Sequence, residues 1–300
     1  MVNTNNCLFH GASSDLIVPF TQTGKIDYAL LADEVNFLIE NGVTGLFVNG
    51  LAGEALMMSA QERLEVLDHA IKASKKRIPV MSNVIFNNIP EAQAFVKQSE
   101  ELGTDAIIIT PPLVYKYSET ALFNHFNSIA TSTNLPVYIY NAPETGNKIS
   151  PEVIANLFET TPNFWGYKDS TQDIIHQQTT LRLIGNDRHF ELLSGSDAQI
   201  VTTMMLGGVG ILSLVTSVFP KLIVAVCDAA EAKNWEEARE IQYKILRVRQ
   251  ALKIGPFMAA YKYVGNLQGA PLGSMKWPLS ELTDSEKEKV NVILKEQKMI

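Results

Sequence analysis

The feature that most constrains the fold is a repeated pattern of short apolar runs, each followed by a segment with helical spacing of apolar residues. The runs start roughly 30 residues apart, which is the length of one strand plus a crossover helix. They are almost continuously apolar, as strands are in a parallel sheet covered on both faces. We therefore expect strands at residues 16–20, 45–49, 79–83, 106–110, 136–140, 164–168, 190–194 and 210–214.

The segments between the runs are expected to be helices. Tyr28, Leu31, Val35 and Leu38 recur at helical spacing, and the same period continues within residues 64–71. Start signals support this interpretation, because a serine or threonine followed three residues later by glutamate forms a capping box. Such boxes occur at residues 59–62 and 283–286, and a serine–proline start occurs at residues 150–151.

Eight strand–helix units predict a (β/α)₈ barrel, with a doubly wound sheet as the alternative because counting units does not prove closure. We expect residues 1–217 to form the barrel core. Residues 218–300 would hold the last barrel helix and a C-terminal helical extension, in one structural unit with the barrel. Within that region we expect helices from residue 235, over 256–264 and over 285–298.

Composition limits the class of protein. The chain is 46% hydrophobic and 19% charged, as in soluble globular enzymes. Its net charge of −7 argues against nucleic acid or an anionic membrane as a partner. No apolar stretch approaches the roughly 20 residues that span a bilayer, two distant cysteines do not suggest disulfides, and no signal peptide is recognisable. We expect a cytoplasmic protein.

Lys168 is unusual because it ends an aromatic, apolar run at a strand terminus. In a barrel of this kind, chemistry takes place at the carboxyl ends of the strands. A lysine there can simply extend its amine to solvent. Alternatively, burial lowers its pKa and frees the amine to attack a carbonyl, forming a Schiff base without metal or organic cofactor.

Tyr140 ends the preceding strand and is the natural proton carrier for such a step. Alternate residues of a strand share a face, so Tyr138 and Tyr140 should point the same way. A purely structural role for Tyr140 is the simpler interpretation. Its place beside Lys168 favours a functional one, because imine formation requires proton transfer to the departing hydroxyl.

Residues 50–54 supply two glycines and exposed backbone amides in a strand-to-helix turn, which can hold a carboxylate. Alone this signal is weak, because glycine-rich turns are common. Other chemistries find little support: the five histidines are scattered, and neither a metal-ligand spacing nor a serine-hydrolase elbow occurs. We expect no metal site and no cofactor.

These motifs, taken together and in order, identify a resemblance that covers essentially the whole chain. The chain resembles the dihydrodipicolinate synthase / N-acetylneuraminate lyase superfamily, class I aldolases on a (β/α)₈ barrel with a C-terminal helical extension. The matching motifs are Gly50-x-x-Gly53-Glu54, Thr110-Pro111-Pro112, Tyr140-Asn141-x-Pro143, Gly166-Tyr167-Lys168-Asp169-Ser170, Ser194-Gly195-x-Asp197 and Gly207-Gly208-x-Gly210.

The resemblance implies Lys168 as the Schiff-base lysine and Tyr140 as the acid–base residue. It implies a small 2-oxo acid substrate and an oligomer, a dimer or a tetramer, of identical chains. It further implies a substrate-binding set that cradles the 2-oxo acid carboxylate and lines the pocket, namely Gly50, Leu51, Ala52, Gly53, Gly195 and Leu212.

Departures from the family pattern are informative. Leu51 and Ala52 replace two hydroxyl residues, and Val114 stands where the synthases place a relay tyrosine. Tyr115 could substitute for it only if the loop were shifted. The synthases also have an arginine for the second substrate's carboxylate, where this chain has an acidic turn at residues 144–146. These losses argue against dihydrodipicolinate synthase activity.

By elimination, the nearest functional relatives are aldolases of 2-keto-3-deoxy sugar acids. A dehydratase of a 3-deoxy sugar acid would use the same lysine and is a second possibility. A third is a non-catalytic ligand-binding homologue that has lost its relay. Retention of both Lys168 and Tyr140 argues against the third, because a pure binding protein has no evident need of that pair.

Overall fold

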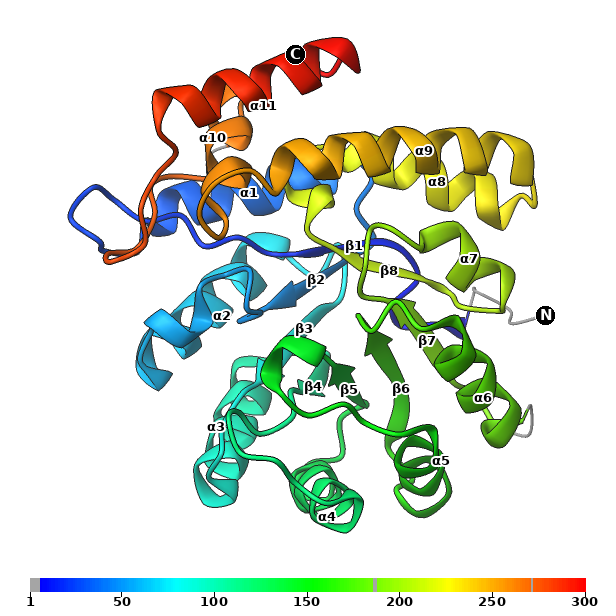
Figure 1. Ribbon diagram of the computed structural model, residues 1–300. Coiled ribbons are helices and arrows are strands. Elements are labelled where there is room, and N and C mark those ends of the chain that lie inside the picture. The colour runs from blue at the N-terminus through cyan, green and yellow to red at the C-terminus, as the bar shows by residue number, and fades with distance from the viewer. Residues whose placement is uncertain (1–5, 186–187, 271) are drawn as a thin grey trace.

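The computed structural model describes residues 6–185, 188–270 and 272–300. Its eight parallel strands close into one barrel in chain order, each paired with its sequence neighbours and β1 with β8 (Figure 1). The closed barrel confirms the (β/α)₈ prediction and excludes the doubly wound sheet. The strands are β1 Gly11–Asp15, β2 Gly45–Val48, β3 Val80–Val84, β4 Ala106–Ile109, β5 Val137–Asn141, β6 Phe164–Asp169, β7 Glu191–Ser194 and β8 Gly210–Ser213.

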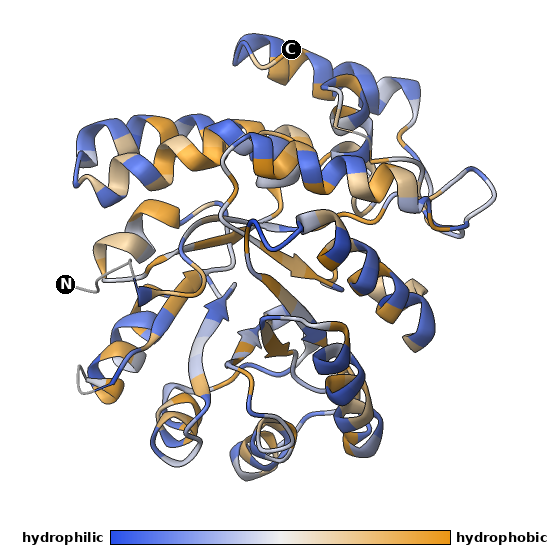
Figure 2. Ribbon diagram, turned by 180° about the vertical axis from the view of Figure 1, so that it is seen from behind, coloured by the Kyte–Doolittle hydropathy of each residue, from blue (hydrophilic) through white to orange (hydrophobic). Residues whose placement is uncertain are grey.

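Helices surround the strands and cover the barrel's outer wall. Figure 2 shows the strands as largely hydrophobic and the helices with hydrophilic outer faces, the pattern of a barrel buried on both sides of its sheet. The barrel helices are α1 Tyr28–Glu40, α2 Ala60–Ser74, α3 Ile89–Leu102, α4 Glu119–Ala130, α5 Pro151–Thr160, α6 Ile174–Ile184, α7 Ile200–Met205 and α8 Pro220–Glu231. Single turns follow three strands: η2 Ala55–Met57, η3 Pro143–Thr145 and η4 Val215–Ser217.

Three further helices follow the barrel: α9 Trp235–Leu252, α10 Ala259–Leu267 and α11 Asp284–Glu296. Helix α9 lies beside α8, and α11 lies beyond it at the edge of the molecule (Figure 1). The helix expected over 256–264 begins and ends three residues later than predicted. Pro256 marks the preceding turn instead, because proline disfavours the helical conformation in the residue before it.

The local start signals are confirmed. Ser59 and Thr283 each form a capping box with the glutamate three residues on, opening α2 and α11. The Ser150 hydroxyl accepts the amide proton of Val153 at the start of α5. These contacts satisfy backbone donors that the first helical turn leaves without partners.

The first strand was predicted wrongly. It lies at Gly11–Asp15, a polar segment, and not at the apolar residues 16–20. Ser14 is buried, and its hydroxyl lies 2.9 Å from that of Ser217, which provides a polar partner within this segment. Leu16 and Val18 are fully buried outside the ladder, against α1 and α2. An apolar run signals burial, but it does not by itself distinguish a strand from a buried strand extension.

Candidate functional site

Lys168 is the central residue of the site. It is the penultimate residue of β6, and the residue is 1% exposed, so its side chain does not extend to solvent. Its Nζ atom lies 4.2 Å from the Tyr140 ring centre and 4.3 Å from the Phe47 ring centre. In the β5–β6 ladder Tyr140 and Lys168 are direct partners, so the barrel register brings them together as predicted.

Asp15 is the partner of Lys168 that was not anticipated. It is the last residue of β1, 3% exposed, and its Oδ2 atom accepts a hydrogen bond from Lys168 Nζ at 3.1 Å. Its other oxygen, Oδ1, is buried without a hydrogen-bond partner among the described residues. The predicted first strand began one residue after Asp15. For that reason the sequence did not suggest that Asp15 lies at the carboxyl end of a strand, where the site is.

Asp15 fits beside the carboxylate turn because residue 50 is glycine. A Cβ atom at Gly50 would lie 2.2 Å from Asp15 Oδ1 and 2.5 Å from the Phe47 ring. The Phe47 ring is fully buried, and the Asp15 carboxylate is held by Lys168 through its other oxygen, so neither can move aside easily. Gly50 therefore serves to admit the aspartate, in addition to shaping the turn.

The charges of this pair correct one expectation. Burial pulls the pKa of Lys168 down, but the acidic groups of Tyr140, Asp15 and Glu144 outweigh it, so that pKa is raised. Burial raises the pKa of Asp15 to about 6, against the opposing effect of Lys168. The raised pKa favours an ammonium at Lys168 over the free amine expected from burial alone, and an ammonium has no lone pair.

Tyr140 is 5% exposed, and its hydroxyl donates to Glu144 Oε1 at 3.2 Å and accepts from Ser170 Oγ at 3.4 Å. Burial raises the pKa of Tyr140 to about 12, although Lys168 opposes the shift. The tyrosine is thus a neutral O–H group held between an acceptor and a donor. This geometry suits a group that passes protons in both directions.

A cavity of about 360 Å³ opens at this end of the barrel. Asp15 and Tyr140 form the part of its wall next to Lys168, and the acidic Glu144 lies at the same side. No residue in its described lining is basic. The remaining lining is mostly apolar and comprises Leu51, Ala52, Glu54, Leu56, Met57, Leu113, Thr145, Leu214, Phe257 and Leu279.

The glycine turn places two residues, Leu51 and Ala52, in the lining of this cavity. Among the described residues, no acceptor bonds the amide N–H of Leu51 or Ala52, whereas the amides of Gly53 and Glu54 bond within the turn.

Glu54 itself forms a buried ion pair: its carboxylate lies 2.6 Å from the Nζ atom of buried Lys262 in α10. That second buried lysine also donates to the carbonyls of Val18 and Ser274, so it is fully engaged.

Two residues predicted to line the pocket, Gly195 and Leu212, are not in the described lining of this cavity. A Cβ at Gly195 would lie 3.0 Å from Lys168 Cγ, so this glycine lets the lysine stem pass. Leu212 is buried in the same cluster as Tyr140. Tyr115, by contrast, is 69% exposed and Val114 80% exposed, and neither lines the cavity. The relay role of Tyr115 stays a prediction.

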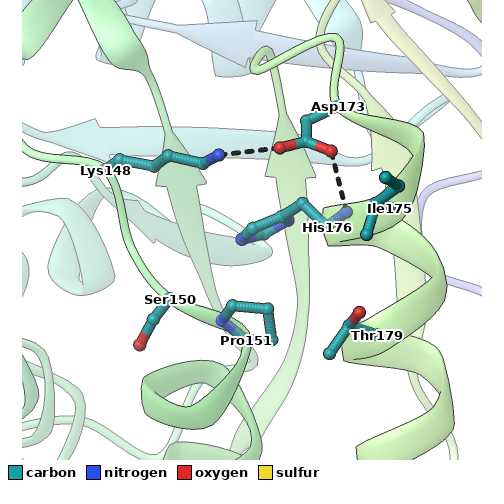
Figure 3. A pocket seen from close by; sticks show the side chains of 7 residues that line it. All are labelled: Lys148, Ser150, Pro151, Asp173, Ile175, His176 and Thr179. Carbon is teal, nitrogen blue, oxygen red and sulfur yellow. Dashed lines mark hydrogen bonds and ion pairs between the residues drawn. The ribbon is translucent and has the colours of Figure 1, made fainter.

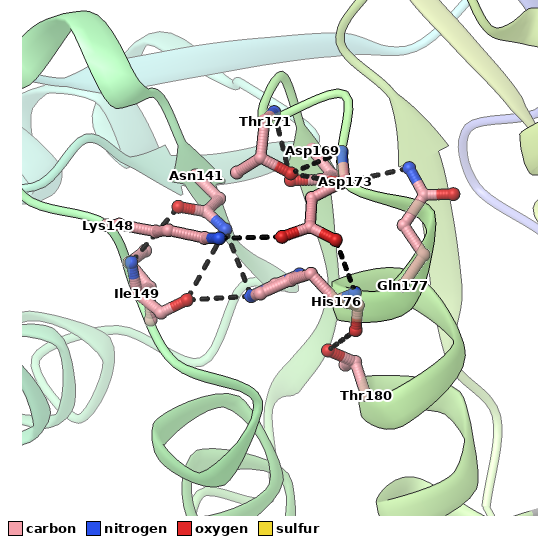
Figure 4. A network of polar contacts seen from close by, with 9 residues as sticks. All are labelled: Asn141, Lys148, Ile149, Asp169, Thr171, Asp173, His176, Gln177 and Thr180. Atoms are coloured by element: carbon pink, nitrogen blue, oxygen red, sulfur yellow. Dashed lines mark hydrogen bonds and ion pairs between the residues drawn. The ribbon is translucent and has the colours of Figure 1, made fainter.

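A polar network holds the ends of β5 and β6 in place (Figure 4). Asp169, next to Lys168, accepts from Gln177 at 2.9 Å and from Thr171 at 3.1 Å. Asn141, next to Tyr140, accepts from the backbone amide of Ile149 at 3.1 Å. These bonds fix the backbone that carries the two candidate catalytic side chains.

A second cavity, of about 330 Å³, lies beside this network between the starts of α5 and α6 (Figure 3). Lys148 and Asp173 form an exposed ion pair at 2.8 Å across its rim. The carboxylate of Asp173 also accepts the amide proton of His176, as the N-cap of α6. Lys148 and Asp173 thus neutralise each other at the rim of this cavity.

The opposite end of the barrel holds another buried carboxylate, Glu191. Its two oxygens accept four hydrogen bonds: Leu8 N at 2.7 Å, Phe9 N at 3.1 Å, Tyr138 OH at 2.6 Å and His189 Nε2 at 2.8 Å. Cys7 lies close enough to join His189 and Glu191 around a metal ion. However, burial raises the pKa of the Cys7 thiol to about 12, and Glu191 is already saturated with donors. Glu191 thus links the N-terminal segment to the barrel through hydrogen bonds, which is a structural role.

Comparison with known proteins agrees with this geometry. The model of the dihydrodipicolinate synthetase family matches residues 8–297. The chain belongs to this family. It is 30% identical to the 4-hydroxy-tetrahydrodipicolinate synthase of Methanococcus aeolicus, over 95% of this chain and 98% of the relative.

Solved structures in the family have the same fold. Dihydrodipicolinate synthase from Thermotoga maritima superposes with a TM-score of 0.92 at 28% identity, covering 98% of this chain and all of the other. The Escherichia coli K12 family member YagE, in complex with pyruvate, gives 0.89 at 26% identity with the same coverage.

Membership of this family of Schiff-base lyases makes the protein an enzyme of the lyase class. Among the described residues, no helix is both long and apolar enough to span a membrane.

Proposed function

We propose that this family member is a class I lyase in which Lys168 forms a Schiff base with pyruvate or a related 2-oxo acid. The observation that carries the proposal is a fully buried lysine, next to a buried tyrosine, directly behind the wall of a cavity at the carboxyl ends of the strands. By contrast, the Nζ atom of the second buried lysine, Lys262, is engaged by three acceptors: the Glu54 carboxylate and the carbonyls of Val18 and Ser274.

The chemistry follows from the positions of these groups. The Lys168 amine adds to the 2-oxo carbonyl, and loss of water leaves an iminium that withdraws electrons from the adjacent carbon. Tyr140 would move protons at the oxygen and carbon atoms involved, and its contact with Lys168 supports this role. The amides of Leu51 and Ala52, which have no protein acceptor, would hold the substrate carboxylate.

The distal half of the substrate is proposed to carry no second negative charge. A carboxylate or phosphate there would meet Glu144 and an apolar wall, with no basic group in the described lining to balance it. This disfavours the activity that the name of the Methanococcus relative states. A 2-keto-3-deoxy sugar acid meets the requirement, because its hydroxyls can bond Glu144 and Thr145, and cleavage would yield pyruvate and an aldehyde.

A dehydratase of a 3-deoxy sugar acid is the second candidate. It is favoured by the contact of Tyr140 OH with Glu144 Oε1, which places a proton donor beside the distal half of the cavity. The two reactions share the imine and differ in the group that leaves, a carbon fragment or water. A cytoplasmic homo-oligomer is proposed for either.

The decisive test is reduction with borohydride in the presence of pyruvate, followed by peptide mass spectrometry. We expect a stable adduct on the peptide containing Lys168, none on the peptide containing Lys262, and none in Lys168→Ala. Absence of any adduct with pyruvate and a panel of 2-oxo acids would refute the proposal. An adduct without turnover would identify a ligand-binding homologue.

Product analysis separates the two candidates. 2-Keto-3-deoxygluconate, a 2-oxo acid with an apolar distal half and a 2-oxo dicarboxylate are incubated with the enzyme. Release of pyruvate identifies the aldolase, and loss of water without pyruvate identifies the dehydratase. Preference for the dicarboxylate would contradict the charge argument.

A further inference from the structure

Lys168 must lose a proton before it can form the proposed imine, and the inference below rests on that proposed function. At rest Lys168 is an ammonium paired with Asp15, and an ammonium has no lone pair for attack. The hydroxyls that relay protons in related synthases are absent: the turn has Leu51 and Ala52, and Val114 lies at the surface. Some other group must therefore accept the proton.

We propose that Asp15 is a catalytic residue that takes the proton from the Lys168 ammonium and returns it to the carbonyl oxygen that departs as water. Asp15 is the group in contact with the reacting nitrogen, at 3.1 Å, and it also lines the cavity that the carbonyl would enter. Glu144, the other acidic group at this side, contacts the Tyr140 hydroxyl instead. The two carboxylates thus serve two different proton carriers.

The atoms balance without any added reactant. Proton transfer converts the ion pair into an amine and a carboxylic acid, which releases Lys168 from its partner. The amine forms the C–N bond, and the carbonyl π electrons move to oxygen, which takes a proton. A second proton, lost from the nitrogen, leaves with the hydroxyl as water. The net change is one carbonyl plus one ammonium giving one iminium plus one water.

The surroundings of Asp15 suit an acceptor more than a structural anchor. Its Oδ1 atom has no partner among the described residues, whereas a structural carboxylate such as Glu191 has both oxygens engaged. Burial shifts its pKa towards neutrality, which makes it a better acceptor than an ordinary aspartate while it stays ionised at neutral pH. The charged or titratable groups acting on it are Lys168, Tyr140, Glu144 and Asp197.

Asp15→Asn is the sharpest test. The amide oxygen can still accept a hydrogen bond from Lys168, but it cannot take a proton. The rate of borohydride trapping at saturating pyruvate should fall by about 10²- to 10⁴-fold, the usual range for a general acid–base group. Glu191→Gln is the matched control, because it removes a buried carboxylate at the opposite end of the barrel; its trapping rate should stay within a few-fold of wild type.

Two readouts separate catalysis from a structural role. The wild-type trapping rate should decline below about pH 6, as Asp15 becomes protonated, and this acidic limb should be missing in Asp15→Asn. Formate should raise the trapping rate of Asp15→Ala at least tenfold, because a small carboxylate can occupy the space that the Asp15 side chain leaves. Rescue also keeps the test valid if Asp15→Asn fails to fold.

Each outcome decides something. A normal trapping rate and an unchanged acidic limb in Asp15→Asn would overturn the role of Asp15 while leaving the imine intact. Absence of trapping in the wild-type enzyme with every 2-oxo acid would instead overturn the proposed function, and the role of Asp15 with it. Lack of formate rescue in a folded Asp15→Ala would assign Asp15 to positioning Lys168.

Discussion

The two ends of the barrel each contain a buried carboxylate, and they are built in opposite ways. Glu191, at the amino end, receives four donors and joins the N-terminal segment to the barrel. Asp15, at the carboxyl end, receives one lysine and keeps an oxygen without a partner. A saturated carboxylate stabilises the fold, whereas an unsaturated one retains the capacity to exchange a proton.

Two tyrosines of β5 repeat this contrast on one strand. They lie on the same inner face, as the alternation predicts: Tyr138 contacts Glu191 and Tyr140 contacts Lys168. One strand thus supplies a structural hydroxyl to one end of the barrel and a candidate catalytic hydroxyl to the other. Substitutions made in matched pairs test whether the two ends of the barrel differ in this way.

The largest effect is expected from the tyrosine pair. Tyr140→Phe should lower turnover by about 10²- to 10⁴-fold, because the shuttled proton is lost, with little change in stability. Tyr138→Phe should leave turnover within a few-fold and reduce the free energy of unfolding by about 1.5–3 kcal/mol, because it removes a hydrogen bond to a buried charge. Steady-state kinetics and urea unfolding measure both. Equal losses of activity would erase the distinction between the two ends.

Glu191→Gln should destabilise the protein by about 2–4 kcal/mol while leaving imine formation intact. The amide nitrogen of glutamine donates, so it would face a backbone N–H at Leu8 or Phe9 with no acceptor between them. Denaturant unfolding and borohydride trapping measure the two quantities. A variant with unchanged stability but slow trapping would show that the amino end contributes to chemistry.

The pH dependence of stability should distinguish Asp15 as well. Its pKa is raised from 3.8 to about 6 in the fold, so its contribution is fully present below about pH 4 and is lost as the pH rises through about 6. Wild type should therefore lose stability relative to Asp15→Asn over that interval, by roughly 2–3 kcal/mol at most. Unfolding of both proteins from pH 4 to pH 7 tests this, and parallel curves would contradict the shift.

The smallest effect is expected from crowding at either end of β2. In Gly50→Ala the new Cβ would press on Asp15 Oδ1. In Gly45→Ala it would press on Phe9 and Ser13 at distances of 2.7 and 2.8 Å. Each should lose about 1–3 kcal/mol of stability. Gly50→Ala alone should also slow trapping, because it displaces the aspartate from Lys168. Equal trapping rates in both variants would argue that the position of Asp15 is immaterial.

Much of this molecule could be predicted from local patterns. The barrel follows from the strand–helix period, and the position of Lys168 follows from the end of an apolar run. The capping boxes at Ser59 and Thr283 could be predicted because they depend on two residues only three positions apart in the chain. Even the pairing of Tyr140 with Lys168 followed from consecutive strands being neighbours in a parallel barrel.

The charge balance around Lys168, by contrast, depends on the tertiary structure and could not be predicted from local patterns. Asp15 and Lys168 are 153 residues apart, and they meet only because the barrel closes and its strands bring both side chains into one interior. The apolar run after Asp15 shifted the predicted strand past it. Burial by itself suggested a neutral amine, but the acidic neighbours make Lys168 an ammonium. Charge acts through space, so its balance depends on neighbours that only the folded chain assembles.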